Sequence, residues 1–436
     1  MQALLSFQQA PPLAAPVRFF LTAPLFAIAG GLLLAWSEPA VLLSRWTPTA
    51  LALTHLLTAG FMLQVMLGAL FQILPVVAGA HITRPLLVAR LVHAALTAGA
   101  LLLTAAFLSY EPLAFQLAVS LLGAGVALFV GAAGRALYGL PVSSPTIPGL
   151  KLALVGLSVT VCLGVLLAIA LAGTSVLPLQ QLTAVHLAWG LIGWGINLLA
   201  AVGFIVVPMF QMTPSYPEWF TRRFSWSLLV LLTAWGSVEL AGGALAAAAF
   251  AATLVLVAAA FPVLTLHLQR RSRRARFDAS QRYWRVAMLS LLLAGATCLA
   301  GNALTEFSEW QAWPWLCGIL LLVGGFMSVM NGMLYKIVPF LVWMHLQNLG
   351  GGRFIAPSMN KVIATWQIER QMQMHCASLC LLVAATIWPE WVLRPAAMVF
   401  LLANAWLLRN LLAATSFFHQ HRERIAALTT TATGRA

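Results

Sequence analysis

The sequence has 436 residues, of which 61% are hydrophobic and only 8% are charged, and its formal net charge is +14. A soluble domain needs far more charged surface, so the composition excludes a water-soluble globular protein and predicts an integral membrane protein. No recognised nucleic-acid-binding motif accompanies the basic charge, so we expect no nucleic-acid partner.

Apolar stretches of about 20 residues recur along the chain, and each can cross the hydrocarbon core of a bilayer as a helix. Lipid offers no partner for backbone N–H and C=O groups, so these stretches must be helical. We predict an all-α polytopic membrane helix bundle, a single transmembrane domain over 1–436. Its twelve helices are expected at 17–37, 49–77, 86–108, 113–137, 150–173, 182–209, 224–241, 243–267, 284–303, 312–342, 376–393 and 395–416.

The charges of the connecting loops alternate along the chain. With the N-terminus in the cytoplasm, most basic residues fall in cytoplasmic loops and the tail: Arg84, Arg222, Arg223, Arg270, Arg271, Arg273, Arg274, Arg276, Arg282, Arg353, Lys361, Arg370, Arg422, Arg424 and Arg435. The opposite loops hold five glutamates: Glu38, Glu111, Glu306, Glu309 and Glu390. This positive-inside pattern predicts that both termini are cytoplasmic, and the lipid bilayer with its anionic headgroups is the expected partner of the basic side.

Three predicted helices end in similar sequences, which indicates an internal repeat. They read GFMLQVMLGALFQILP, GWGINLLAAVGFIVVP and GGFMSVMNGMLYKIVP, and they align without a gap at 60–75, 193–208 and 324–339. A polar residue occupies the same position in each copy, namely Gln64, Asn197 and Ser328. Each copy is the second helix of a four-helix group, so we predict repeats at about 17–137, 150–267 and 284–416.

Two histidines lie near the outer ends of the first two repeated helices. His55 is 20 residues before Pro75, and His186 is 22 residues before Pro208. Ionisable residues inside a membrane span are costly and often functional, and neutral imidazole is a common ligand of metals and haem iron. Ala59, Gly60 and Gly68 would leave room for a flat macrocycle below His55. Each histidine also has an ordinary alternative role, as a side chain hydrogen-bonded to a neighbouring helix.

The segment His55–Pro75, HLLTAGFMLQVMLGALFQILP, resembles the second helix of subunit I of the haem–copper oxidases and nitric oxide reductases. Twelve helices in three groups of four are also the plan of that superfamily, and the chain is similar to its divergent NnrS family. The resemblance implies haem b, or copper, bound through His55 and His186. It further implies a bacterial inner-membrane location and a respiratory or cytochrome partner.

The sequence departs from the oxidase pattern at most metal-ligand positions. Gly190 stands where an oxidase has a tyrosine four residues after the histidine of the sixth helix, and the tenth helix has no histidine before His345. We therefore expect no complete binuclear centre. A second axial ligand for a haem on His55 is not identified by the pattern, and Cys317 or an open position remain alternatives to His186.

A second group of ligand-type residues begins the eleventh predicted helix. His375, Cys376 and Cys380 combine imidazole with thiols, which suits Cu(I), and Cys376 and Cys380 share one helix face. The competing interpretation is ordinary packing, because free cysteine behaves as a small apolar side chain. Lys336 lies one turn from the cytoplasmic end of the tenth helix and is expected to extend its amine to the interface.

Three functions are compatible with these features, and none assigns a catalytic residue. The first is an oxidase-like protein with a haem or metal centre that serves electron transfer, the response to NO or redox stress, or haem and copper handling. The second is a transporter of a small solute or a metal, with Gln64, Asn197 and Ser328 lining a central path. The third is a cofactor-free assembly subunit of a respiratory complex.

Overall fold

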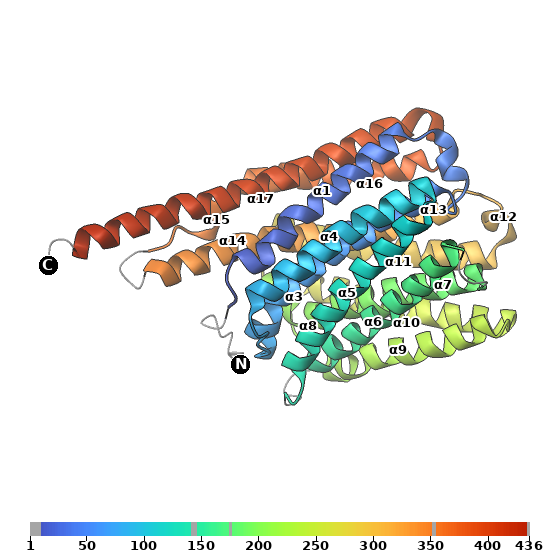
Figure 1. Ribbon diagram of the computed structural model, residues 1–436, viewed down its shortest axis with the longest axis horizontal. Coiled ribbons are helices and arrows are strands. Elements are labelled where there is room, and N and C mark those ends of the chain that lie inside the picture. The colour runs from blue at the N-terminus through green and yellow to red at the C-terminus, as the bar shows by residue number, and fades with distance from the viewer. Residues whose placement is uncertain (1–9, 141–145, 174–176, 351–354, 434–436) are drawn as a thin grey trace.

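The computed structural model describes residues 10–140, 146–173, 177–350 and 355–433, and within these ranges the chain is helical and has no β-strand. Long helices run side by side along the long axis of the molecule (Figure 1). Ten spans are long and apolar enough to cross a membrane. The prediction of an all-α polytopic membrane helix bundle is therefore confirmed.

The described ranges contain twelve long helical spans. In chain order they are α1 (Ala14–Trp36), α2–η3–α3 (Pro48–Ala78), α4 (Pro85–Ser109), α5 (Pro112–Leu137), α6 (Thr146–Leu171), α7–η4–α8 (Leu179–Gln211), α9 (Glu218–Leu240), α10 (Ala244–Arg270), α11 (Ala279–Ala303), α13–η5–α14 (Trp313–Gly350), α16 (Thr365–Ala385) and α17 (Pro389–Thr433). Short helices lie in three connections: η2 (Pro39–Leu43), α12 (Thr305–Ser308) and α15 (Met359–Val362).

The predicted bounds of the last two helices are wrong. The eleventh helix was expected at 376–393, but α16 begins at Thr365 and ends at Ala385, and α17 begins at Pro389. The first turns of α16 are polar, so hydropathy placed them outside the span. The structure includes them because Gln371 is fully buried and donates a hydrogen bond from Nε2 to the carbonyl of Ala403 (3.0 Å).

Three spans lie inside a ring formed by the other nine. Ring neighbours pack along their lengths, as α1 does on α17, α4 on α5, and α10 on α11. The inner spans are the three that carry the aligned proline motif. In their most apolar windows 61% to 78% of the residues are buried, against at most 50% in the other membrane-length spans. The repeated helices therefore form the centre of the bundle.

Each inner span contains a π-helical segment at the same distance from its proline. These segments are η3 (Leu56–Met62), η4 (Trp189–Ile196) and η5 (Ile319–Met327). A π-helix widens the turn, loosens the ordinary hydrogen-bond register and is frequent at functional sites. The shared position agrees with a threefold repeat, whose bounds at 17–137, 150–267 and 284–416 stay a prediction.

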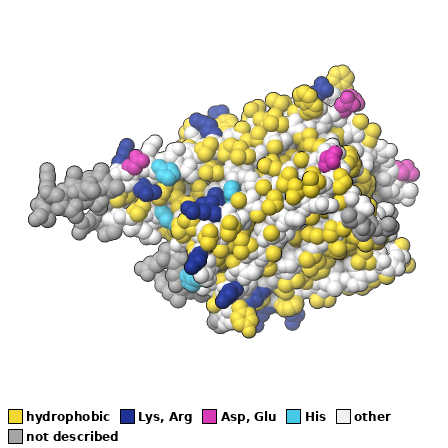
Figure 2. Space-filling model, in the orientation of Figure 1, with side chains coloured by type: hydrophobic (Ala, Val, Ile, Leu, Met, Phe, Trp, Pro, Cys, Tyr) yellow, Lys and Arg dark blue, Asp and Glu magenta, His cyan; other side chains and the backbone are white. Residues whose placement is uncertain are grey.

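Charged residues separate toward the two ends of the bundle (Figure 2). We call one end the basic end, where α3, α8 and α14 finish and where Arg84, Arg90, Arg222 and Arg271 lie. We call the other the acidic end, where the connections carry Glu38, Glu111, Glu306, Glu309 and Glu390. Arg353 and Arg435, which the sequence also assigned to the basic side, lie outside the described residues.

Candidate metal site between His55 and His186

His55 and His186 lie beside each other near the acidic end of the bundle. His55 is the last residue of the eight-residue helix α2, immediately before η3, and His186 stands in α7, three residues before η4. Their ring centroids are 6.5 Å apart, and the ring planes differ by only 18°. The fold thus brings together two histidines that are 131 residues apart in the sequence.

Each imidazole is oriented by a backbone carbonyl. Nδ1 of His55 is 2.8 Å from the carbonyl oxygen of Leu51, one turn earlier in the same helix. Nδ1 of His186 is 3.0 Å from the carbonyl oxygen of Thr160 on the neighbouring helix α6. Hydrogen bonds of this kind select the tautomer in which Nδ1 donates and Nε2 keeps its lone pair for a metal. Both rings are therefore held as potential ligands.

Packing fixes the positions of the same two rings. The His55 ring lies against Phe107 of α4, with centroids 4.8 Å apart. The His186 ring lies over Gly164 of α6, where an added Cβ would be 3.1 Å from Cε1 of the imidazole. The missing side chain at Gly164 thus makes the space that His186 occupies.

The separation of the two rings suits a shared metal ion. A ligating imidazole nitrogen lies about 2.0 Å from its metal and about 1.1 Å from its own ring centre, so two imidazoles on opposite sides of one ion have centres about 6.2 Å apart. The observed 6.5 Å is close to this value. Among the described residues no third His, Cys, Asp or Glu joins them in a group able to hold a metal.

Aromatic rings fill the space beside Gly60 and Gly68 that the sequence assigned to a flat macrocycle. Gly60 and Gly68 were expected to leave room below His55, but an added Cβ at Gly60 would be 2.5 Å from the Phe26 ring. At Gly68 it would be 2.8 Å from Phe19 and from Phe20. These glycines admit aromatic rings of α1 instead, so the expectation of free space is wrong.

Cys317, the other candidate axial ligand, belongs to a different contact. Its thiol donates to the carbonyl of Ala294 on α11, with the sulfur 3.6 Å from the oxygen. Cys298, one turn further along α11, interacts with it. The structure thus pairs Cys317 with α11, and not with His55.

His375, Cys376 and Cys380 do not converge on one point. The His375 side chain is fully buried, and its Nε2 is 2.8 Å from Oγ of Ser328 on α14. Cys376 is only half-buried and Cys380 is exposed on the outside of the bundle. Neighbouring positions on a helix point in directions about 100° apart, so His375 and Cys376 cannot face the same ligand.

Two of the three equivalent polar residues of the repeat form hydrogen bonds with surrounding helices. Gln64 donates from Nε2 to Oγ1 of Thr97 on α4 (3.1 Å), and Ser328 pairs with His375 on α16. Asn197 is fully buried, and its amide atoms have no partner among the described residues. In the first and third groups the polar residue therefore joins the inner span to the third helix of its own group.

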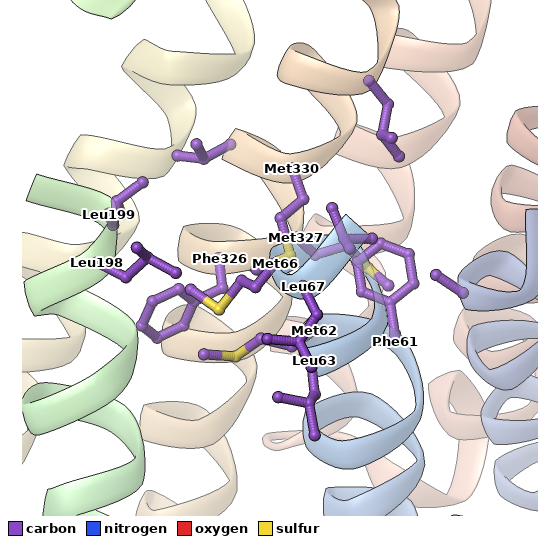
Figure 3. Packing of buried hydrophobic residues seen from close by; sticks show 14 of the residues in the cluster. Phe61, Met62, Leu63, Met66, Leu67, Leu198, Leu199, Phe326, Met327 and Met330 are labelled. Carbon is purple, nitrogen blue, oxygen red and sulfur yellow. The ribbon is translucent and has the colours of Figure 1, made fainter. Parts of the chain in front are cut away.

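Apolar side chains fill the space between the three inner spans (Figure 3). They converge from all three spans: Met62, Leu63, Met66, Leu198, Leu199, Phe326, Met327 and Met330. Gly195 allows this close approach, because an added Cβ there would be 2.7 Å from Phe326 and 2.8 Å from Met62. A central polar path lined by Gln64, Asn197 and Ser328 is not what this arrangement provides.

Sequence reasoning missed a buried polar cluster among α11, α14, α16 and α17. Tyr283 donates to the Gln371 side chain, and Asn410 donates to Tyr335 (2.9 Å). Ser378 is fully buried without a hydrogen-bond partner among the described residues, and the fully buried Asn331 interacts with Tyr283. Of these residues, only Gln371 and Tyr283 lie outside the spans that hydropathy predicts, and the helical spacing of the cluster was the one signal available.

Asp278 forms the charged boundary of this cluster at the basic end. Its Oδ2 accepts from Lys336 Nζ at 2.7 Å and pairs with Arg274 at 2.5 Å, while Oδ1 caps α11 by accepting from the Gln281 N–H. Burial alone would raise the pKa of Asp278, but these bonds and charges prevail and hold it below its ordinary value. Lys336 therefore reaches a half-buried carboxylate at the basic end, the end toward which its amine was expected to extend.

We predict that Lys336→Met destabilises the protein at neutral pH by about 1 kcal/mol, because Asp278 loses a charge-assisted hydrogen bond while it is partly buried. A lowered pKa means that the pair's contribution is present above the ordinary aspartate pKa and is lost as the pH falls through the folded value. Thermal unfolding in detergent between pH 7 and about pH 3 should therefore show the difference from wild type shrinking. Arg222→Met, which breaks an exposed pair with Glu218, should show no difference at any pH.

Comparison with known proteins assigns no family to the chain. No protein-family model and no curated protein matches its sequence.

Proposed function

We propose that this protein is an oxidase-like membrane protein that binds one metal centre through His55 and His186 and lacks a binuclear centre. The pair of imidazoles carries the proposal. Both rings are oriented by backbone carbonyls, both leave Nε2 as the ligand atom, and their centroids are 6.5 Å apart.

Copper is the occupant that we propose. Imidazole suits copper, zinc, iron and nickel, and copper binds nitrogen ligands most strongly among the divalent first-row ions. A Cu(I) ion also accepts two ligands in a line, as the ring separation suggests. Haem requires a macrocycle between the rings, and Phe26, Phe19 and Phe20 fill the space in which it was expected.

Apolar side chains fill the space between the three inner spans, which favours electron transfer, redox-stress response or copper handling over transport. Resemblance to the haem–copper oxidase plan in the proline motif and the helix count supports this assignment. On this proposal the protein lies in a bacterial inner membrane with both termini in the cytoplasm. The acidic end, which holds the site, then faces outward and can meet a respiratory or cytochrome partner.

The test is to purify the protein in detergent from cells supplied with copper and haem, using an affinity tag that contains no histidine. We expect about one copper per chain by elemental analysis, and no haem band in the visible spectrum. A stoichiometric haem band that depends on both histidines would replace copper by haem at this site. A colourless, metal-free protein would overturn the proposal and favour a cofactor-free assembly subunit.

A further inference from the structure

An open cavity of about 640 Å³ lies at the basic end, far from the histidine pair. It is formed by α14, the segment that follows residue 354, α15 and the end of α17. Its lining residues are Trp343, Ile355, Ala356, Pro357, Ser358, Lys361, His421 and Arg424. These helices extend to the left of the bundle in Figure 1, beside the C-terminus.

The charge of this cavity is entirely basic. Lys361 and Arg424 line it, and the cavity lining contains no Asp or Glu. Neither side chain has an ion-pair partner among the described residues, whereas Arg222, Arg274, Arg282 and Lys336 all do. Glu423 is exposed and does not line the cavity.

Neutral donors complete the lining. The hydroxyl of Ser358 and the indole N–H of Trp343 belong to the lining residues. Two cations with two neutral donors form a chemical match for a phosphate group, which offers negative charge and several acceptor oxygens.

Exposed apolar side chains near the cavity indicate that the phosphate belongs to a lipid and not to a water-soluble molecule. Ile355 is 88% exposed, Trp366 58%, Leu349 50% and Met359 45%. Exposed apolar and aromatic side chains next to a basic pocket are expected at a membrane interface, where acyl chains begin below the headgroups. A water-soluble phosphate has no apolar part that could contact these exposed side chains.

We propose that the cavity binds the phosphate of an anionic phospholipid headgroup, with Lys361 and Arg424 as the charged ligands. The site is independent of the metal centre. It ties the projecting ends of α14 and α17 to the lipid surface on the basic side of the bundle.

Native mass spectrometry of delipidated protein tests the proposal, with phosphatidylglycerol compared against phosphatidylcholine. Wild type should retain phosphatidylglycerol in preference, and Lys361→Gln/Arg424→Gln should bind it about 30-fold more weakly, because each of the two basic residues near the surface contributes about 1 kcal/mol. The charge-matched control is Arg90→Gln/Arg422→Gln, which removes two exposed basic residues at the same end and should bind like wild type. Lys361→Arg/Arg424→Lys should also bind like wild type, which separates lost charge from misfolding.

Two results contradict the proposal. One is equal retention of both lipids, or equal losses in the test and control variants, which would reduce the effect to general surface charge. The other is displacement of phosphatidylglycerol by millimolar inorganic phosphate in proportion to its concentration, which would assign the cavity to a free phosphate.

Discussion

His55→Ala and His186→Ala are each expected to remove the bound metal almost completely. Each substitution deletes one of the two protein ligands that the structure brings together, so affinity should fall by more than the roughly 100-fold that loss of an outer partner costs. The metal content of purified protein, measured after dialysis against a weak chelator, should drop from about one ion per chain to background.

His93→Ala is the matched control for the histidine variants. His93 is also a membrane-embedded histidine, but its Nε2 is 2.8 Å from Oγ1 of Thr22 and its ring lies against Phe19. This variant should keep its metal, although it loses a histidine hydrogen bond of similar length to those lost in the His55 and His186 variants. Equal metal loss in all three variants would mean that the metal responds to general damage and that the pair is not the site.

Gly164→Ala refines the same prediction without touching a ligand atom. An added Cβ would be 3.1 Å from Cε1 of His186, which is closer than ordinary contact and forces the ring to shift. A shift of a few tenths of an ångström should weaken metal affinity by a smaller factor than loss of the ring. The ordering wild type, Gly164→Ala, His186→Ala is therefore the expected series.

Gly156→Ala is expected to destabilise the protein by about 3 kcal/mol or more, which is at the upper end for added volume in a packed core. An added Cβ at Gly156 would be 2.2 Å from the carbonyl oxygen of Gly193, 2.4 Å from its carbonyl carbon and 2.8 Å from the Trp194 nitrogen. All three are backbone atoms that cannot rotate away, so α6 and η4 must move apart. Thermal unfolding followed by tryptophan fluorescence measures the loss.

Gly131→Ala provides the control for the helix itself. Gly131 lies in α5, and nothing is within 4 Å of an added Cβ there. Alanine favours a helix over glycine by roughly 1 kcal/mol, so this variant should unfold at the same temperature as wild type or slightly higher. If Gly156→Ala behaved in the same way, the close approach of α6 to η4 would be disproved.

Hydropathy was enough to predict the fold class, because a helix that crosses lipid must place about 20 apolar residues in the bilayer whatever its neighbours are. The described residues contain the twelve long helices that were expected, and ten of these are apolar enough to cross a membrane. Even the turn between α9 and α10 followed from Gly242 and Gly243, since Gly242 adopts the positive φ of 80° that ends such a helix. The method failed at α16. There Gln371 and His375 are stabilised by partners on other helices, and no local pattern reveals those partners.

The sequence pattern singled out the two histidines of the site one by one, and it did not predict the distance between their rings. Their depth in equivalent helices singled out His55 and His186, but nothing in the sequence predicts that the rings meet. The contact depends on Gly164 and on the carbonyl of Thr160, both on α6, and on the π-helical turns that follow each histidine. A π-helical turn has no reliable sequence signature. Its free-energy cost relative to an α-helical turn is offset by packing between helices, which the local sequence does not reveal.

The amino-acid sequence by itself determined that this is a multi-span helical membrane protein with a recurring proline-terminated inner helix, because local hydropathy and repeated residues are properties of the chain. Tertiary structure decided what those helices do. It directed Gln64 and Ser328 away from the centre, filled the space beside Gly60 with Phe26, and placed two imidazoles 6.5 Å apart. Contacts between residues more than a hundred positions apart arise only when the helices pack, and for this reason the histidine pair became visible only in the folded chain.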